Sequence, residues 1–291
     1  MTQLRCLRAV VDQGGFVAAS AHLHLSQSAV SHAVKALEQA LGAPLLLRGN
    51  RGGVALTAAG AAALAEARLA LAAVERMAAG VADAAGARRL TGTLRIGVVQ
   101  SAAVHLLPGW LRRLRADQPG IAVALHEGTD PEVMDWVRAG VVEAGVTSRT
   151  HPDLAARPVR QDEYVVVVPD GHPLGGRPRV GLRELNGQRM LLSGGGCETL
   201  IEELLAAAGS NPEIVCVVRD NATLASMVAG GLGLTVMPEL ALPASRMGLK
   251  LVRLRPTLRR TLHLLTRPPD ARGPMVLALI DAAEASLPAN P

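Results

Sequence analysis

The hydrophobic pattern of this 291-residue chain changes near residue 90, and the change limits the folds that the chain can adopt. Before that point, apolar residues recur every three or four positions, which is typical of amphipathic helices. From Leu94 onward, short apolar runs alternate with helical segments, as in α/β domains with largely parallel sheets. The sequence therefore predicts a helical N-terminal domain and a larger α/β C-terminal domain.

The composition narrows the class of protein. Hydrophobic residues make up 49% of the chain, so we expect it to fold, and aromatic residues make up only 1%, so Ala, Val and Leu must build the cores. No apolar run is long enough to span a membrane, and residues 1–8 lack a signal-like apolar stretch. The three cysteines have neither metal-ligand nor disulfide spacing. These features favour a cytoplasmic protein without a metal or cofactor.

Three short helices and a hairpin are expected in the first 60 residues. Helices are predicted over 4–11, over 16–23 and after Ser26, whose side chain is a typical N-cap. The inward positions of the third helix are aliphatic: Val30, Val34, Leu37 and Leu41. Residues 45–56 form two apolar runs around a glycine-rich tip, which predicts a small wing.

Residues 58–87 are predicted to form one long, Ala-rich helix. Its apolar residues alternate at spacings of three and four: Leu64, Ala67, Leu71, Val74, Ala78 and Val81. Such a heptad seam indicates pairing with a second copy of the helix, so the chain is expected to form a homodimer. The alternative is that the helix packs on its own domain. A linker over 86–92 follows.

The outward face of the third helix carries side chains that suit DNA. It presents Gln27, Ser28, Ser31, His32 and Lys35. Gln, Ser and His can hydrogen-bond to base edges in the major groove, whereas the Lys is expected to contact phosphate. Arg48 and Arg51 on the wing would add backbone or minor-groove contacts. The first 60 residues contain five basic and two acidic residues, and the resulting +3 favours a nucleic-acid partner. The alternative is an ordinary solvated helix face.

The segment from Leu4 to Gly60 resembles, without a gap, the DNA-binding domain of LysR-type transcription regulators. The resemblance is carried by Gly15-Phe16, Ala18-Ala19-Ser20, residues 23–31, Ala36-Leu37-Glu38, residues 41–45, Arg48 and residues 56–60. It implies a winged helix-turn-helix over 1–60 and a linker helix for dimerisation over 58–87. It also places base reading on the five polar residues of the third helix. Ser28 stands where the family usually has Pro, and Val17 where it commonly has Thr.

Residues 94–291 resemble, more weakly, the effector-sensing domain of the same family. The landmarks are Leu106-Leu107-Pro108, residues 118–121, Glu127-Gly128, residues 230–234 and Met237-Pro238. The implied fold is two α/β subdomains joined by two crossovers, similar to type 2 periplasmic binding proteins. Subdomain one would comprise 94–147 plus 265–291, and subdomain two 163–262.

The strand-to-helix junctions of this domain carry groups suited to a small ligand. Ligands of open α/β sheets bind beyond the carboxyl ends of the strands, where helix N-termini attract anions. The predicted effector site combines these junctions with the crossover: Gln100, Ser101, Thr129, Thr147, Ser193, Gly195, Cys197, Asn221 and Thr223. The glycines at 194–196 suggest a backbone nest for a carboxylate, so a small carboxylic acid is the expected effector. Each residue alone fits a helix cap equally well.

Cys197 supports a second interpretation. It begins a predicted helix, where a thiol can be reactive, and it lies where peroxide-sensing members of the family place their oxidised cysteine. A thiol-redox regulator is therefore the alternative, although that helix has no second cysteine and Cys216 is expected in a buried strand.

Other classes are less well supported by the sequence. No nucleophile elbow, phosphate-binding loop, dinucleotide motif or metal-spaced His pair is present, so we do not expect an enzyme. The N-terminal domain argues against a solute-binding protein alone. The expected partners are double-stranded promoter DNA, a small-molecule effector, further copies of the chain in a dimer or tetramer, and RNA polymerase, with no membrane partner.

Overall fold

The computed structural model describes residues 1–48, 53–84 and 90–286. The chain divides into two compact units, residues 1–88 with 139–141 and residues 89–138 with 142–291. The first unit is mainly helical and the second is α/β, as the change in hydrophobic pattern predicts. No described helix is both long enough and apolar enough to cross a membrane.

The N-terminal unit contains the predicted helices and hairpin. Its elements are α1 (Thr2–Asp12), α2 (Phe16–Leu23), α3 (Gln27–Leu41), β1 (Leu46–Arg48), β2 (Val54–Leu56) and α4 (Ala58–Ala84). The predicted N-cap of α3 is confirmed, because the Ser26 hydroxyl accepts a hydrogen bond from the Ala29 amide at 3.2 Å. The helix ends after Leu41, and the residue that caps it is Gly42, whose φ of 69° lies in the left-handed region that glycine favours.

Aliphatic side chains hold the three short helices together. Val30 and Val34 of α3 are buried in a core shared with α1 and α2, and Leu37 belongs to a second core with Leu7. Leu41, which the spacing predicts to face inward, is instead 55% exposed. It is the last residue of α3, and the chain leaves the helix there, so the core ends one turn earlier.

The long helix α4 has two different halves. In the first half the seam residues are at most 3% exposed: Leu64, Ala67 and Leu71. Leu64 joins the core of α1 and α3. In the second half, Met77 and Val81 are 65% and 67% exposed. The first half of the seam therefore packs on its own domain, and the second half leaves apolar side chains uncovered. Residues 85–89, which include the end of the predicted helix, lie outside the described residues.

A short motif fixes where α4 begins. The Thr57 hydroxyl accepts a hydrogen bond from the Gly60 amide at 2.8 Å and donates one to the Pro44 carbonyl at 2.7 Å. A Cβ added at Gly60 would lie 1.9 Å from the Leu45 carbonyl oxygen. Because the helix and the wing approach so closely, only glycine fits at this position.

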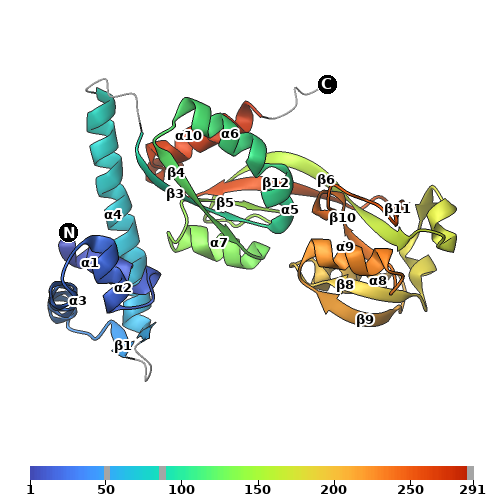
Figure 1. Cartoon of the computed structure of the whole chain (residues 1–291), viewed down its shortest axis with the longest axis horizontal. Coiled ribbons are helices and arrows are strands. Elements are labelled where there is room, and N and C mark those ends of the chain that lie inside the picture. The colour runs from blue at the N-terminus through green and yellow to red at the C-terminus, as the bar shows by residue number, and fades with distance from the viewer. Residues whose placement is uncertain (49–52, 85–89, 287–291) are drawn as a thin grey trace. The chain divides into compact units, whose positions relative to one another are not determined.

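The C-terminal unit is an α/β domain in two halves (Figure 1). The first half contains β3 (Gly92–Val98), α5 (Gln100–His105), α6 (Leu107–Asp117), β4 (Ile121–Glu127), α7 (Asp130–Arg138), β5 (Ala144–Thr147), η4 (Pro269–Ala271) and α10 (Pro274–Glu284). The second half contains η1 (Pro173–Gly176), β7 (Arg179–Val180), η2 (Leu182–Leu185), β8 (Arg189–Ser193), α8 (Glu198–Ala207), β9 (Glu213–Val218), α9 (Asn221–Ala229), β10 (Thr235–Pro238), η3 (Glu239–Ala241) and β11 (Leu249–Leu254). Two strands, β6 (Ala155–Pro169) and β12 (Arg259–Thr266), run between the halves and confirm the expected pair of crossovers.

The main sheet is mixed. Its strand order is β4-β3-β5-β12-β6-β11-β7, with β10 also paired to β6. The pairs of β3 with β4 and β5 are parallel, but β12 runs antiparallel to β5 and β6, and β6 runs antiparallel to β10 and β11. The expectation of largely parallel sheets is therefore wrong. The chain passes between the halves once in each direction, so the two crossover strands lie antiparallel.

The strands β8 and β9 form a small parallel pair within the second half. An isolated bridge from Met190 to Leu234 joins this pair to the rest of that half. The sequence predicts β9 as a buried strand, but its residues Ile214 and Val217 are 43% and 59% exposed. Among the described strands β9 pairs only with β8, so one of its edges has no partner strand.

Alternate residues of β6 face two different cores in the second half. Val166 and Val168 belong to one cluster, which also includes Tyr164, and Val165 and Val167 belong to the other. Cys197 packs against the first cluster and Cys216 against the second. The strand thereby brings Tyr164 and Cys197 to the same side of the sheet.

Candidate functional site

The outward face of α3 is polar, as the sequence predicts. Gln27, Ser28, His32 and Lys35 are exposed, and Ser31 is half-buried. The hydroxyl oxygens of Ser28 and Ser26 lie 3.0 Å apart, so Ser28 contacts the helix cap. The opposite face is fixed by the buried Val30 and Val34, which leaves the polar residues on one accessible stripe.

The wing is tied to α3 through a carboxylate. The Glu38 Oε1 atom accepts hydrogen bonds from the amides of Leu45 and Leu46, at 2.8 and 3.2 Å. These contacts set the direction in which the hairpin leaves the helix. Arg48 is the last residue of β1, and its side chain is not among those described. Arg51 lies outside the described residues.

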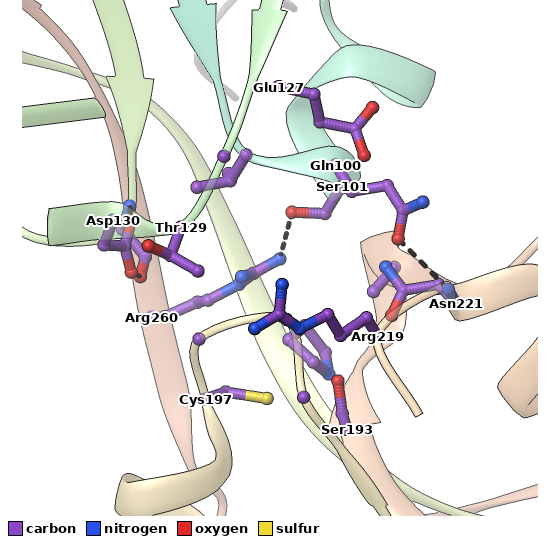
Figure 2. A pocket seen from close by; sticks show the side chains of 18 of the residues that line it. Gln100, Ser101, Glu127, Thr129, Asp130, Ser193, Cys197, Arg219, Asn221 and Arg260 are labelled. Carbon is purple, nitrogen blue, oxygen red and sulfur yellow. Dashed lines mark hydrogen bonds between the residues drawn. The ribbon is translucent and has the colours of Figure 1, made fainter. Parts of the chain in front are cut away.

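A cavity of about 290 Å³ lies between the two halves of the C-terminal unit (Figure 2). It lies where α5, α7, α8 and α9 begin, beyond the ends of β3, β4, β8 and β9. Seven of the nine predicted effector residues line this pocket: Gln100, Ser101, Thr129, Ser193, Gly195, Cys197 and Asn221. The convergence arises because these strands end at the same edge of their sheets.

Two predicted effector residues are not in the lining. Thr147 is fully buried, and its hydroxyl donates to the Arg149 carbonyl at 2.6 Å. Thr223 donates both its amide and its hydroxyl to Asp220 Oδ1, at 2.8 and 2.7 Å. Both side chains serve the local backbone, one at the crossover and the other at the start of α9.

Arg260 is the most constrained cation of the pocket, and it is not among the site residues predicted from the sequence. Its Nε donates to Asp162 Oδ2 at 2.9 Å, and its Nη2 lies 2.8 Å from the same oxygen. Nη2 also donates to the Ser101 hydroxyl at 2.8 Å. Asp162 is itself held, because its Oδ1 accepts from the amides of Glu163 and Leu240. The buried carboxylate therefore fixes the guanidinium at the pocket wall.

Tyr164 and Arg219 also line the pocket as possible hydrogen-bond donors, and neither is among the site residues predicted from the sequence. The Arg260 guanidinium carbon lies 5.9 Å from the centre of the Tyr164 ring, within range of a cation–π contact. Burial is the main cause that raises the pKa of Tyr164 to about 12, so its hydroxyl stays protonated near neutral pH. The pair Arg259-Arg260 at the start of an alternating strand was the available signal, since neighbouring residues on a strand face opposite sides.

Several junction groups are hydrogen-bonded within or between their own loops. Glu132 Oε2 accepts from both the amide and the hydroxyl of Thr129, each at 2.8 Å. Glu198 accepts from the Gly196 amide at 2.7 Å, and Gly194 donates to the Val218 carbonyl at 2.9 Å. Two of the three glycine amides therefore already donate to other groups of the chain, so fewer amides are free to bind a carboxylate than the sequence predicts.

Gln100 links the two halves across the pocket. Its Nε2 donates to Asp220 Oδ2 at 3.0 Å, and its Oε1 accepts from the Asn221 amide at 3.1 Å. One side chain of the first half thus occupies the N-terminus of α9 in the second half, as Figure 2 shows. The hydrogen bonds at Asp220, mainly those from Thr223, lower the pKa of its carboxyl.

Cys197 lies in the pocket, but its surroundings disfavour the thiolate. Burial is the largest effect and raises the pKa of the Cys197 thiol, although Ser193 and Arg260 act in the opposite direction. Within the described residues there is no cluster of His, Cys, Asp and Glu that could hold a metal ion.

Comparisons with known proteins agree with the geometry. Residues 1–61 match the family "Bacterial regulatory helix-turn-helix protein, lysR family", and residues 87–288 match "LysR substrate binding domain". The probable HTH-type regulator LrrA of Synechococcus elongatus is 36% identical, with 83% of this chain and 81% of that protein covered. A probable hydrogen peroxide-inducible genes activator of Streptomyces viridosporus is 35% identical, with 83% and 78% covered.

A solved structure supports the same fold. A full-length OxyR variant from Pseudomonas aeruginosa superposes with a TM-score of 0.77 at 23% identity, covering 97% of this chain and 94% of that one. The two matched domains together span most of the sequence. The chain therefore belongs to the LysR family: it is a DNA-binding transcription regulator in which a helix-turn-helix domain precedes an effector-binding domain.

Proposed function

We propose that the polar stripe of α3 reads the operator in the major groove. Gln27, Ser28, Ser31 and His32 contact base edges, and Lys35 contacts phosphate, while Arg48 and Arg51 of the wing reach the backbone or the minor groove. The observation that carries this proposal is the burial of the aliphatic face of α3, which turns the polar side chains outward.

The test compares specific with non-specific DNA binding. A variant with Gln27, Ser31 and His32 all changed to Ala should lose about 100-fold in affinity for DNA fragments that the parent selects from its genome. Affinity for unrelated DNA should stay within about threefold, because the phosphate contacts remain. Gln13→Ala, an exposed amide at the end of α1, is the control. Unchanged selectivity of the triple variant would refute the proposal.

We propose that two chains pair through the second half of α4, and that dimers associate into tetramers. The domains would be 1–60 for DNA binding, 58–87 for dimerisation and 94–291 for sensing, with subdomains 94–147 plus 265–291 and 163–262. The exposed Met77 and Val81 support this pairing. Val81→Glu should shift the protein toward monomers in analytical ultracentrifugation, and a dimer as stable as the parent would contradict the pairing.

We propose that the pocket binds a small carboxylic acid as effector. Arg260 supports this assignment because Asp162 orients its guanidinium toward Ser101 at the wall of the pocket. Charge-assisted hydrogen bonds of this kind are typical of carboxylate recognition. An acid bound between the halves would favour one arrangement of them and so bias the promoter complex. The chain would act without catalysis, and RNA polymerase is the proposed further partner.

A thermal-shift screen tests the effector site. Small mono- and dicarboxylic acids are added to the full-length protein and to Arg260→Gln. At least one acid should raise the melting temperature of the parent, and the shift should disappear in the variant. Absence of any shift with every acid, or an equal shift in the variant, would refute the assignment.

A thiol-redox function is the second candidate, and the named peroxide-inducible relative favours it. The raised pKa of Cys197 weighs against it, because the thiolate is the form that reacts with peroxide. Cys216 packs in a different core, so it is poorly placed as a resolving partner. Cys197→Ser tests this function: a loss of peroxide-dependent changes in promoter binding would support redox sensing, and an unchanged response would exclude a role for this thiol.

A further inference from the structure

The acidic residues of the pocket are largely occupied by their own neighbours. Asp130 accepts hydrogen bonds from the amide and the hydroxyl of Ser148, at 2.7 and 2.6 Å. Glu132 accepts two from Thr129. Of the lining carboxylates only Glu127 accepts no hydrogen bond from the described chain, and Figure 2 shows it on the opposite side of Gln100 from both arginines. Few carboxylate oxygens therefore compete with a ligand for hydrogen bonds from the arginines, although, besides the hydrogen bonds from Thr129, the charge of Arg219 also helps to lower the pKa of Glu132.

The donors, in contrast, are partly unused. Arg260 uses Nε and Nη2 for Asp162 and Ser101, whereas its Nη1 has no hydrogen-bond partner among the described residues. The Arg219 guanidinium has no hydrogen-bonded partner there at all, and the Tyr164 hydroxyl has none either. Figure 2 shows both guanidinium groups pointing into the space between Ser101 and Cys197. Two cations from different elements thus face one small cavity.

The glycine-rich loop makes room for the second arginine. A Cβ added at Gly194 would lie 3.3 Å from Arg219 Cγ and 2.9 Å from a Val217 methyl group. The stem of Arg219 therefore lies against the loop at a position where a larger residue would displace it. This close packing directs the guanidinium toward the pocket even though the side chain is exposed.

We propose that the effector is a small dianion whose two negative charges are shared between Arg260 and Arg219. The inference rests on the proposed effector site and specifies its ligand class. A dicarboxylate would place one carboxylate on each guanidinium, and a phosphate monoester would place both guanidinium groups on one phosphate. Both cations can form paired hydrogen bonds with such oxygens. The cavity of about 290 Å³ is at the lower end of ligand pockets, which suits molecules of a few carbon atoms.

The test uses probes that differ by one charge at nearly constant size. Calorimetry of the full-length protein compares succinate with its monoamide, succinamate, and adds malonate, glutarate and methyl phosphate. At least one dianion should bind, and succinate should bind at least tenfold more tightly than succinamate if the dicarboxylate is the preferred source. Tighter binding of methyl phosphate than of all three dicarboxylates would identify the dianion as a phosphate monoester and would equally support the proposal.

Variants of the protein test the dianion proposal separately from the proposed effector site. Arg219→Gln should weaken dianion binding about tenfold or more and change succinamate binding less than twofold. The control Arg112→Gln removes one exposed charge from α6, outside the pocket, and should have no effect. Equal binding of succinate and succinamate, without tighter binding of methyl phosphate, overturns the dianion and leaves a carboxylic acid effector in place. Binding of none of the probes overturns the dianion, and the wider acid screen then decides the effector site. An unchanged melting temperature of the unliganded Arg219→Gln protein shows that its fold is intact.

Discussion

The outward face of α3 and the lining of the pocket are both polar, but their side chains are used differently. On α3, Gln27, His32 and Lys35 form no side-chain hydrogen bonds within the described chain. In the pocket, Gln100 and Asp130 are already bonded to other parts of the fold. The face of α3 leaves most of its polar groups free for a partner, whereas the pocket, which is assembled from many segments, uses several of its polar groups to hold those segments together.

The largest expected effect comes from breaking the support of the pocket. Asp162→Ala would leave Arg260 without its carboxylate and the amides of Glu163 and Leu240 without an acceptor. We expect the free energy of unfolding of the C-terminal unit to fall by about 3–5 kcal/mol. Urea denaturation followed by tryptophan fluorescence measures it, since Trp110 and Trp136 both lie in that unit.

The matched control for this variant is an exposed carboxylate. Asp117→Ala removes the exposed i,i+4 pair with Arg113 and should cost less than about 1 kcal/mol. A similar small loss for Asp162→Ala would mean that the buried pair does not support the pocket, and the contrast between the two regions would fail.

Alkylation of Cys197 sharpens the comparison through pH. Burial raises the pKa of the Cys197 thiol. The pKa of a free cysteine is about 8.5, so at neutral pH the thiolate fraction of Cys197 is smaller than that of a cysteine in a free peptide. We expect iodoacetamide to modify Cys197 several-fold more slowly than a cysteine peptide at pH 7, with the rate still rising above pH 9. Peptide mass spectrometry follows the site. A rate above that of the peptide would show an activated thiol and favour redox sensing.

Breaking the hydrogen bonds of Gln100 across the pocket should have a smaller effect on stability. Gln100→Ala removes the acceptor of the Asn221 amide and the donor to Asp220. A hydrogen bond of this kind contributes about 1 kcal/mol, so hydrogen exchange at the start of α9 should accelerate about fivefold. Exchange in α3 should stay the same and serves as the internal reference. Equal protection of α9 in the variant would show that Gln100 does not hold the halves together.

The smallest expected effect tests the other region. Val17, in the first turn of α2, is 68% exposed, and no side chain caps this helix. Val17→Thr would add a hydroxyl where the family commonly has one, and we expect DNA affinity to rise about two- to fivefold through an added phosphate contact. Filter binding on specific and unrelated DNA measures it. A gain restricted to specific DNA would indicate base contact instead.

The fold and the candidate pocket were predictable to different depths. The cap at Ser26 follows from a local pattern, the pair of crossovers was implied by the family resemblance, and seven of the nine predicted effector residues line one cavity. The mixed sheet was not predictable, because strand direction depends on how the chain returns between the halves. The prediction that Leu41 faces inward was wrong for a related reason, because helical spacing predicts which face is apolar but not where the elements that cover it end.

The sequence by itself determined the order of elements, the helix whose outward face is polar and the junctions at which the pocket forms. These features depend on residues a few positions apart, since periodicity and capping act within a turn or two. Only the tertiary structure decided which polar groups remain available to a ligand. Arg260 meets Asp162 and Ser101 across 98 and 159 positions of sequence. Contacts over such separations depend on the packing of whole strands, which no local pattern encodes.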